Sequence, residues 1–373
     1  MTVPSLYSAI KSSDGMQKTI DNFASANPIF VCVISYTGTS QIPGITMAGG
    51  SSHLIAFTPA ADAEFLYYGK CKCIPGVPVT PEGIPTPALI TRAVLMKSKI
   101  ASLIVDAGSK IKPVLPAISF DIKHGGNIIE EEGLCRSDSI KAFENGKLLG
   151  MQLALITDMV IIGESIPGGT TTALAVLTAF GIEAKFKVSS SMPVNPHELK
   201  NKVVDIALDK IDNLIQLRTD PLTLVSLVGD PMIPSAAGIA CGAMSQGAKV
   251  MLAGGTQMTA VLCLLKALNV SLEKICIGTT SYVKNDESSD ISYLVDCICD
   301  RVPILSIDLG LEYSNKEGLK SYKSGIAKEG VGAGGASIAA TLKLGSRWTS
   351  RALLRTLEAE YENSIEKNLT HNQ

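Results

Sequence analysis

The sequence predicts an α/β fold, a three-layer α/β/α arrangement with a mostly parallel, Rossmann-like sheet between two layers of helices. Two observations lead to this fold class. Seven short apolar runs rich in β-branched residues alternate with segments of helical periodicity, and most of these runs end in glycine. Strands buried on both faces have such continuous apolar runs, and the helices between them fit the right-handed crossovers of a parallel sheet.

The expected elements follow in order along the chain. We expect strands at residues 30–36, 102–108, 159–164, 222–230, 249–255, 274–280 and 303–310. We expect crossover helices at residues 137–156, 170–180, 196–213, 234–246, 256–268 and 285–299, and a further helical run after the glycines at 330–335. Loops at the carboxyl ends of parallel strands are where such sheets bind ligands.

The two ends of the chain also have helical patterns, at residues 4–24 and 347–363. We therefore expect a large α/β substrate-binding and catalytic domain at residues 26–340. Residues 1–25 together with residues 341–373 would form a small helical subdomain. The stretch 71–87 is rich in proline and glycine, which predicts either an extended loop over the binding edge of the sheet or a linker.

The composition is that of a globular chain. Its 373 residues are 46% hydrophobic and 18% charged, and the net charge is −2. No basic stripe with interleaved aromatic residues is visible, so we expect no nucleic-acid partner. No apolar run reaches the ~18 residues of a membrane helix, and the first residues lack the pattern of a signal peptide. We expect a cytoplasmic protein with no membrane partner.

The nine cysteines do not indicate a metal site. Most lie in apolar runs, as Cys32, Cys263 and Cys276 do, which is typical of small core residues in a reducing compartment. The pairs at 71–73 and 297–299 lack C-x-x-C spacing, and the four histidines are scattered along the chain. We therefore expect no bound metal.

The segment Met159–Phe180 places an acidic, glycine-rich turn between an apolar strand and a helix. Glycines let the backbone bring N–H groups close to an anion, and the start of a helix adds partial positive charge. Threonine hydroxyls can cap the helix or donate to the anion. The residues that we expect to bind a phosphate here are Gly163, Gly168, Gly169, Thr170 and Thr171, with Thr172 as a further cap.

The spacing of this first glycine loop is that of a nucleotide P-loop in which glycine replaces the lysine. The clamp for β- and γ-phosphates is therefore missing, and Glu164 at the mouth of the loop would repel a polyphosphate. A phosphomonoester such as a mononucleotide fits this donor set better than ATP does. The alternative is a glycine turn that only packs the helix on the sheet.

A second acidic glycine loop, AKEGVGAGGA, occupies residues 327–336. Its glycines, Gly330 and Gly332 among them, satisfy G-x-G-x-x-G, but no strand leads into them, so a dinucleotide site is not predicted. Glu329 stands at the entrance to this loop, as Glu164 does in the first. Each loop therefore offers backbone donors and one carboxylate, although either carboxylate could instead stabilise a helix dipole.

The two loops together resemble the signature loops of the nicotinate-nucleotide:dimethylbenzimidazole phosphoribosyltransferase family, which builds the lower ligand of cobalamin. That family reads roughly G-E-M-G-I-G-N-T-T and G-E-G-[TS]-G-A, where this chain has GESIPGGTT at 163–171 and KEGVGA at 328–333. The similarity runs in order through residues 104–108, 125–127, Lys200 and 228–238. It covers roughly residues 100 to 340, and the segments 42–46, 61–66 and 252–258 resemble an archaeal and cyanobacterial branch of the family.

The resemblance implies a reaction and roles for particular residues. The family's phosphoribosyl transfer to an aromatic base needs no cofactor, and its members are homodimers. The resemblance makes Glu329 the base that takes a proton from the incoming azole. Glu164 would stabilise an oxocarbenium-like transition state, and Lys200 would neutralise the 5′-phosphate of nicotinate mononucleotide.

The sequence departs from the family where the aromatic base is expected to be held. The family's D-H-G is replaced by residues 35–37, SYT, and its L-D-G-F by residues 252–255, which include Gly254 and Gly255. The reaction type is therefore better supported than the acceptor, which could be a benzimidazole or adenine. The alternative function is a non-catalytic binder of nucleotides or corrinoid precursors with the same fold.

Two other enzyme classes fit the sequence less well. A phosphoribosyltransferase that uses the diphosphate donor usually has paired acids before a Thr-Gly loop to hold Mg²⁺, and no expected strand ends in that way. A kinase would need the lysine that the first glycine loop lacks.

Overall fold

The computed structural model describes residues 7–9, 23, 26–79 and 83–367. Its centre is a sheet in which the described residues contribute eight strands in the order β1-β8-β7-β6-β5-β2-β3-β4. Their bounds are β1 Tyr7–Ala9, β2 Pro28–Ile34, β3 Ala101–Asp106, β4 Ile118–Ser119, β5 Met159–Ser165, β6 Lys249–Ala253, β7 Ile275–Thr280 and β8 Ile304–Ile307. All neighbouring pairs are parallel except β1 with β8 at the edge.

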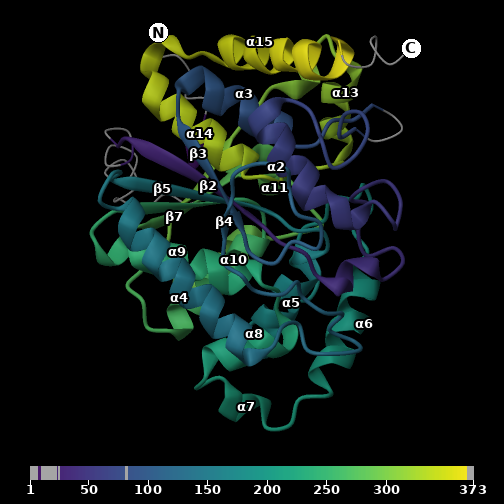
Figure 1. Cartoon of the computed structure of the whole chain (residues 1–373), viewed down its shortest axis with the longest axis vertical. Coiled ribbons are helices and arrows are strands. Elements are labelled where there is room, and N and C mark those ends of the chain that lie inside the picture. Colours follow the sequence, from purple (N-terminus) through teal and green to yellow (C-terminus); the bar gives the residue numbers. More distant parts are fainter. Residues whose placement is uncertain (1–6, 10–22, 24–25, 80–82, 368–373) are drawn as a thin grey trace.

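Helices cover both faces of this sheet, which confirms the three-layer α/β/α class (Figure 1). The lower layer in Figure 1 contains α4 Arg136–Leu153, α5 Gly169–Ala179, α6 His197–Leu208, α8 Pro221–Val228, α9 Met232–Ser245, α10 Gln257–Ala267 and α12 Ile291–Cys299. The upper layer contains α2 Thr58–Tyr68, α3 Ala88–Ser98, α14 Ala333–Leu344 and α15 Ser350–Tyr361. Short helices α7 Leu214–Leu217, α11 Ser281–Lys284 and α13 Glu317–Lys320 lie in the connections.

Alternate residues of the central strands build two separate cores. In β2, Val31 and Val33 belong to the core beneath the sheet, whereas Phe30, Cys32 and Ile34 belong to the core above it. Successive side chains of a strand point to opposite faces, so a strand between two helical layers must be apolar throughout. This is the physical reason for the continuous apolar runs of the sequence.

One expected strand is a helix. Residues 222–230 were expected to form a strand, but residues 221–228 form α8. Asp220 caps this helix by accepting a hydrogen bond from the Thr223 N–H, and Pro221 occupies its first turn. The buried run of leucine and valine is compatible with either element, and the Asp-Pro helix start decides between them. The other six expected strands are confirmed, with bounds that differ by up to three residues.

Helices α2 and α3 have no counterpart among the expected elements. Helix α2 is buried from Pro59 to Leu66 and has almost no polar face, so its sequence lacks the periodic stripe that marks a surface helix. Both helices flank the 71–87 stretch, and they pack on one another above β2.

The expected helical subdomain is described only in part. Helix α15 confirms the C-terminal helix, and it packs against α3 of the large domain, where Arg92 and Glu360 form an ion pair of 2.8 Å. Residues 7–9 form strand β1 and not a helix, and most of residues 1–25 lie outside the described part of the chain. The division at residue 340 and the pairing of the two ends stay predictions. Within the described residues, no helix is long and apolar enough to cross a membrane.

Candidate active site

The two glycine loops meet above the carboxyl end of β5. A Cβ atom placed on Gly332 would lie 3.0 Å from the Cα of Gly163, and one on Gly163 would lie 3.1 Å from the Cα of Gly332. The N–H of Val331 donates to the carbonyl of Glu164 at 2.9 Å. Gly332 also has a φ of 68°, which few other residues adopt without strain. Glycine at both positions is what lets the two backbones approach this closely.

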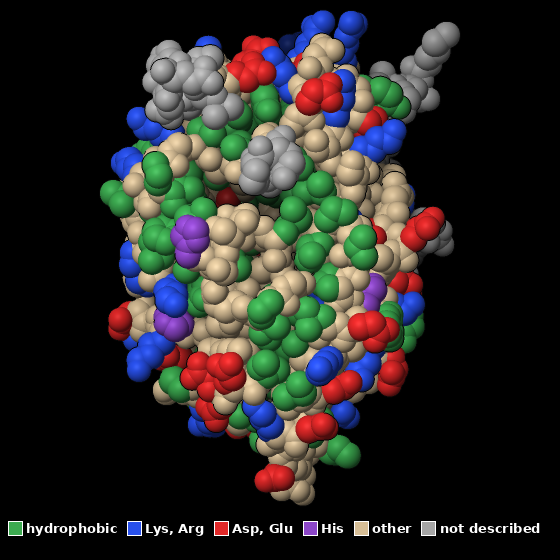
Figure 2. Space-filling view, turned by 90° about the vertical axis from the view of Figure 1, so that its right-hand side faces the viewer, with side chains coloured by type: hydrophobic (Ala, Val, Ile, Leu, Met, Phe, Trp, Pro, Cys, Tyr) green, Lys and Arg blue, Asp and Glu red, His purple; other side chains and the backbone are tan. Residues whose placement is uncertain are grey.

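A cavity of about 450 Å³ opens at this junction. Its walls come from segments that lie far apart in the sequence: 45–50, 57–62, 74–79, 84–87, 164–170, 189–191 and 326–331. The charged residues among its described lining are Asp62, Glu164, Lys328 and Glu329. Figure 2 shows a hollow in the surface of the molecule, with an acidic side chain visible inside it.

Glu329 lines the cavity with a partly exposed side chain. One carboxylate oxygen accepts from the Thr280 N–H at 2.9 Å, at the end of β7, and the other accepts from the Gly334 N–H at 3.0 Å, in the first turn of α14. Burial raises the pKa of Glu329 to about 7, although these N–H donors favour the charged form. A carboxylate held so firmly and titrating near neutrality suits a general base.

Glu164 lies near the carboxyl end of β5, lines the same cavity and is almost fully buried, with 3% of its surface exposed. Its carboxylate accepts from the Ile166 N–H at 3.0 Å. Burial, together with the nearby carboxyl groups of Asp230, Glu329 and Asp62, raises its pKa to about 8. These surroundings therefore favour the neutral form near neutral pH, and a cation in the cavity would favour ionisation.

Asp62, on α2, is a third buried acid of the cavity. Its two oxygens accept hydrogen bonds from the hydroxyls of Thr86, at 2.6 Å, and Ser165, at 2.7 Å. Burial raises the pKa of Asp62 to about 6, while both hydroxyls favour the charged form. Three acids that cannot easily ionise together make the cavity complementary to a positively charged ligand.

Three of the five residues expected to bind a phosphate line the cavity. Helix α5 begins at Gly169 after the left-handed Gly168, and Gly168, Gly169 and Thr170 line the cavity. Thr171 and Thr172 are fully buried and are not lining residues. The Thr172 hydroxyl donates to Asp230, so it holds α5 in place behind the loop.

Lys200 lies behind the cavity wall, although it was expected to contact a phosphate directly. It is completely buried, and its ammonium donates to the carbonyl of Ser189 at 2.7 Å and to the side chain of Asn195 at 3.1 Å. Burial, together with the charge of Lys328, lowers its pKa to about 7. Lys200 therefore positions the 189–191 segment, which does line the cavity.

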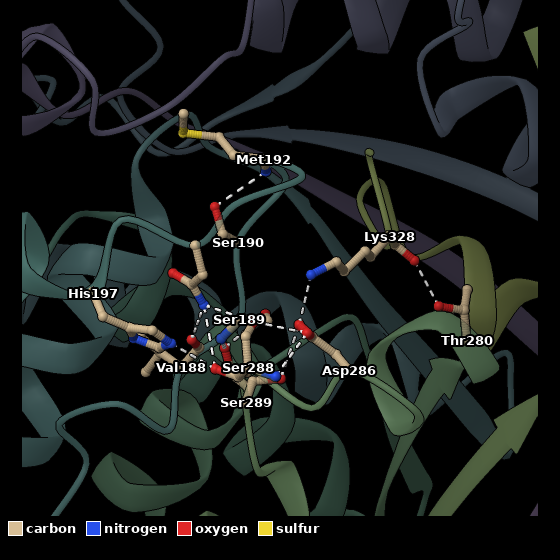
Figure 3. Close-up of polar contacts among 12 residues, drawn as sticks. Val188, Ser189, Ser190, Met192, His197, Thr280, Asp286, Ser288, Ser289 and Lys328 are labelled. Atoms are coloured by element: carbon tan, nitrogen blue, oxygen red, sulfur yellow. Dashed lines mark hydrogen bonds and ion pairs between the residues drawn. The ribbon is translucent and has the colours of Figure 1, made fainter. Parts of the chain in front are cut away.

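Lys328 is the one cation among the described lining residues, and the sequence analysis gave it no role. Its ammonium forms an ion pair of 2.8 Å with Asp286, and its carbonyl accepts from the Thr280 hydroxyl at 2.6 Å (Figure 3). Asp286 in turn accepts from the hydroxyls of Ser288 and Ser289. This network fixes the entrance of the second loop against the end of β7.

The two segments expected to hold the aromatic base lie elsewhere. Neither residues 35–37 nor residues 252–255 belong to the cavity lining. Gly254 and Gly255 instead follow β6 behind the wall, and a Cβ atom on Gly255 would lie 3.3 Å from the Ser189 hydroxyl and 3.8 Å from the Cβ of Glu329. Gly255 thus allows Glu329 and the 189–191 segment to pack closely.

The described residues of the 71–87 stretch form an apolar part of the cavity wall, which we call the cover. Its described residues 74–75, 77–79 and 84–87 line the cavity, most of them proline, valine or isoleucine. The Tyr322 hydroxyl donates to the carbonyl of Pro85 at 2.8 Å, which ties the cover to the C-terminal half. In the described part of the chain, no cluster of histidine, cysteine and acidic residues could hold a metal ion.

Asp62 and Asp230 were not identified from the sequence because their sequence patterns are weak. Asp62 stands in ADAEFL, a segment that indicated only the branch of the family. Helix α2, which contains it, was not predicted. Asp230 accepts from the Met232 and Ile233 N–H groups at the start of α9, and the Asp-Pro-Met spacing could have indicated this helix cap.

Comparison with known proteins agrees with this geometry. A family model described as phosphoribosyltransferase matches residues 92–287. The UPF0284 protein of Sulfurisphaera tokodaii is 46% identical over 339 residues, which cover 91% of this chain and 94% of the relative. The UPF0284 protein of Archaeoglobus fulgidus is 42% identical over 342 residues, 92% of this chain and 95% of the relative.

A solved structure shares the fold. The nicotinate-nucleotide-dimethylbenzimidazole phosphoribosyltransferase from Thermus thermophilus superposes with a TM-score of 0.60 over 94% of this chain and 92% of that chain, at 14% identity. Such a low identity establishes the fold alone, whereas the family model and the archaeal relatives establish kinship. The chain therefore belongs to the nicotinate-nucleotide:dimethylbenzimidazole phosphoribosyltransferase family, in its archaeal UPF0284 branch, and this membership supports phosphoribosyl transfer as the general reaction.

Proposed function

We propose that the protein moves a 5-phosphoribosyl group from nicotinate mononucleotide to an aromatic nitrogen base and so makes an α-riboside 5′-phosphate for the lower ligand of a cobamide. One observation carries the proposal. The two glycine loops touch at Gly163 and Gly332, and this contact brings Glu164 and Glu329 into one cavity with the start of α5. The base is a benzimidazole-like compound or adenine.

The chemistry of the donor explains why the reaction needs a general base but no general acid. Nicotinate bound to C1′ is a pyridinium, so its departure neutralises the ring and needs no general acid. The incoming azole attacks C1′ with one ring nitrogen and must lose an N–H proton. Glu329 accepts that proton, and its pKa of about 7 leaves a substantial fraction of it ionised near neutral pH.

The charge in the transition state suits the buried acids. As the bond to nicotinate breaks, positive charge develops on the ribose ring, and attack from the opposite face inverts the configuration at C1′. Glu164 would be drawn toward its ionised form by this cation and would stabilise it at short range in a poorly solvated cavity. Repulsion from Asp230, Glu329 and Asp62 raises the pKa of Glu164, and the same cation would offset this repulsion.

The phosphate would lie at the start of α5. Gly168 and Gly169 allow a close approach of the backbone, and the helix N-terminus attracts an anion. The 189–191 segment forms the facing wall, held from behind by Lys200. We assign Lys200 a positioning role toward this wall.

The direct test is turnover with a panel of acceptors. The purified protein is incubated with nicotinate mononucleotide and benzimidazoles, phenols or adenine, and nicotinate release and riboside formation are followed by chromatography. Glu329→Gln should lower kcat by roughly 10²- to 10⁴-fold, the usual contribution of a general base. Glu130→Gln, at an exposed position outside the cavity, should leave kcat unchanged.

Tight binding of nicotinate mononucleotide without nicotinate release under any acceptor would contradict the transferase and favour a nucleotide-binding protein. The family resemblance also implies a homodimer, which light scattering would detect as twice the chain mass of 39.2 kDa.

A further inference from the structure

Asp62 is a nearly buried carboxylate of the cavity wall. Phe57 and Ala61, just before it in the chain, also line the cavity, and 5% of the surface of Asp62 is exposed. Each of its two oxygens accepts one hydroxyl hydrogen bond, from Thr86 and Ser165. A carboxylate oxygen has two acceptor positions, so Asp62 retains capacity for hydrogen bonds from a ligand.

Asp62 and the phosphate end of the cavity belong to opposite layers of the fold. The start of α5 lies with the helices below the sheet, whereas α2, which carries Asp62, lies with those above it (Figure 1). The cavity runs over the carboxyl edge of the sheet between them. A nucleotide anchored by its phosphate at α5 would therefore direct its reacting carbon toward the side on which Glu329 and Asp62 lie.

The strand residues that anchor Glu329 and Asp62 lie two strand spacings apart. Asp62 is bonded to Ser165 at the end of β5, Glu329 is bonded to Thr280 at the end of β7, and β6 lies between these strands. Neighbouring strands are ~4.8 Å apart, so the two anchor points are ~10 Å apart. This width accommodates a fused two-ring base with a hydrogen bond of ~3 Å at each end.

We propose that Asp62 selects an acceptor base that carries an exocyclic amine on the edge remote from its ring N–H, as adenine does. Glu329 takes the ring N–H at one end of the base, and Asp62 accepts the amine N–H at the other. A base with an apolar remote edge, such as dimethylbenzimidazole, would instead desolvate the carboxylate without giving it a partner. The proposal rests on the proposed function, since it assigns the acceptor of that reaction.

The rival explanation is that Asp62 only ties α2 to β5 and to the cover. A purely structural Asp62 would need its hydrogen bonds with the hydroxyls of Ser165 and Thr86, but it would not discriminate between acceptor bases. The two roles can be separated because Ser165→Ala removes one tie and leaves the carboxylate in the cavity, whereas Asp62→Ala removes the carboxylate.

Calorimetric titration of the full chain with adenine and with purine, which lacks only the exocyclic amine, tests the proposal without requiring turnover. The wild type should bind adenine roughly tenfold to a hundredfold more tightly than purine, the usual effect of a hydrogen bond to a charged group. Asp62→Ala should bring the ratio close to one, and Asp62→Asn, a gentler change, should lower it partly. Ser165→Ala should keep the preference, and nicotinate mononucleotide should bind all variants alike.

Equal binding of adenine and purine by the wild type, no detectable binding of adenine, or a preference that survives both Asp62 substitutions would overturn the proposal. So would loss of nicotinate mononucleotide binding in Asp62→Asn, because Asp62 would then face the ribose. Nicotinate release is measured on the same samples. An amine preference without release leaves this inference standing and contradicts only the transferase reaction.

Discussion

Glu164 connects the proposed chemistry with the stability of the fold. In the unfolded chain its carboxyl titrates near 4.5, and in the folded protein burial and the neighbouring acids raise the pKa to about 8. Between these values the folded protein keeps a proton that the unfolded chain has released. The stability that depends on the neutral carboxyl is therefore complete below about pH 4.5 and is lost as the pH rises through 8.

We predict that Glu164→Gln stabilises the substrate-free protein at alkaline pH. Glutamine keeps the shape of the neutral acid and cannot ionise, so its advantage over the wild type should grow from pH 5 to 8 and then level off. Each pH unit in this window is worth at most about 1.4 kcal/mol. Urea unfolding at several pH values measures the difference in unfolding free energy, and exposed Glu130→Gln should give a difference near zero throughout. A constant difference at all pH values would show that Glu164 does not titrate in this range.

The two acids of the glycine loops were predictable from the sequence, whereas the third acid and the lysine were not. Glu164 and Glu329 each stand next to glycines that mark a loop at a strand or helix end. Asp62 lies in the middle of a buried helix without a polar face, and only the tertiary fold turns it toward the cavity. Lys200 was assigned to the phosphate because a lysine in a polar helical segment reads as accessible, but its helix packs it inward against Ser189.

At the scale of elements, the site depends on the contact between the two glycine loops. We predict that Gly332→Ala destabilises the protein and weakens nicotinate mononucleotide binding. The new Cβ atom would meet Phe30 at 2.9 Å and the Gly163 backbone at 3.0 Å, so the loops would have to move apart. The left-handed φ of 68° adds a backbone cost of about 1 kcal/mol.

Gly310→Ala is the matched control for this prediction. Gly310 has nearly the same left-handed conformation, φ 63° and ψ 25° against 68° and 29° at Gly332, but a Cβ atom there would meet only the Tyr313 ring, at an ordinary contact distance of 3.8 Å. The difference in unfolding free energy between the two variants isolates the contact between the loops from the backbone cost. If both variants lose equal stability and bind the nucleotide equally well, the loops do not depend on this close approach.

The buried strands could be predicted from the sequence, whereas the buried helices α2 and α8 could not. Strands between two helical layers are apolar on both faces, so six of them appear as continuous apolar runs. That signal does not distinguish a strand from a buried helix, and residues 221–228 form α8 because Asp220 and Pro221 begin a helix there. Helix α2, which carries Asp62, is buried nearly all round and has no periodic stripe to reveal it.

At the scale of the whole molecule, the C-terminal part of the chain holds the cover of the cavity. Tyr322 donates to the carbonyl of Pro85 at 2.8 Å, and Tyr361 of α15 donates to the carbonyl of Gly83 at 3.3 Å. Both tyrosines are buried. The cover, α15 and the second glycine loop therefore form one connected body, and contacts far from the proposed chemistry should influence how the acceptor base binds.

We predict that Tyr322→Phe raises the KM for the acceptor base by about threefold to tenfold, the effect of losing one hydrogen bond of ~1 kcal/mol that holds the cover. Tyr67→Phe is the control, because the Tyr67 hydroxyl donates to the carbonyl of Ser102 at 2.9 Å and so loses a similar bond away from the cover. Both variants should lose comparable stability on thermal unfolding, since each leaves a carbonyl without its partner. Only Tyr322→Phe should change KM, because only that carbonyl belongs to a segment that lines the cavity. Equal KM values for the two variants would mean that the cover keeps its place without this hydrogen bond. The C-terminal part would then have to influence the cavity through α14 and the second glycine loop.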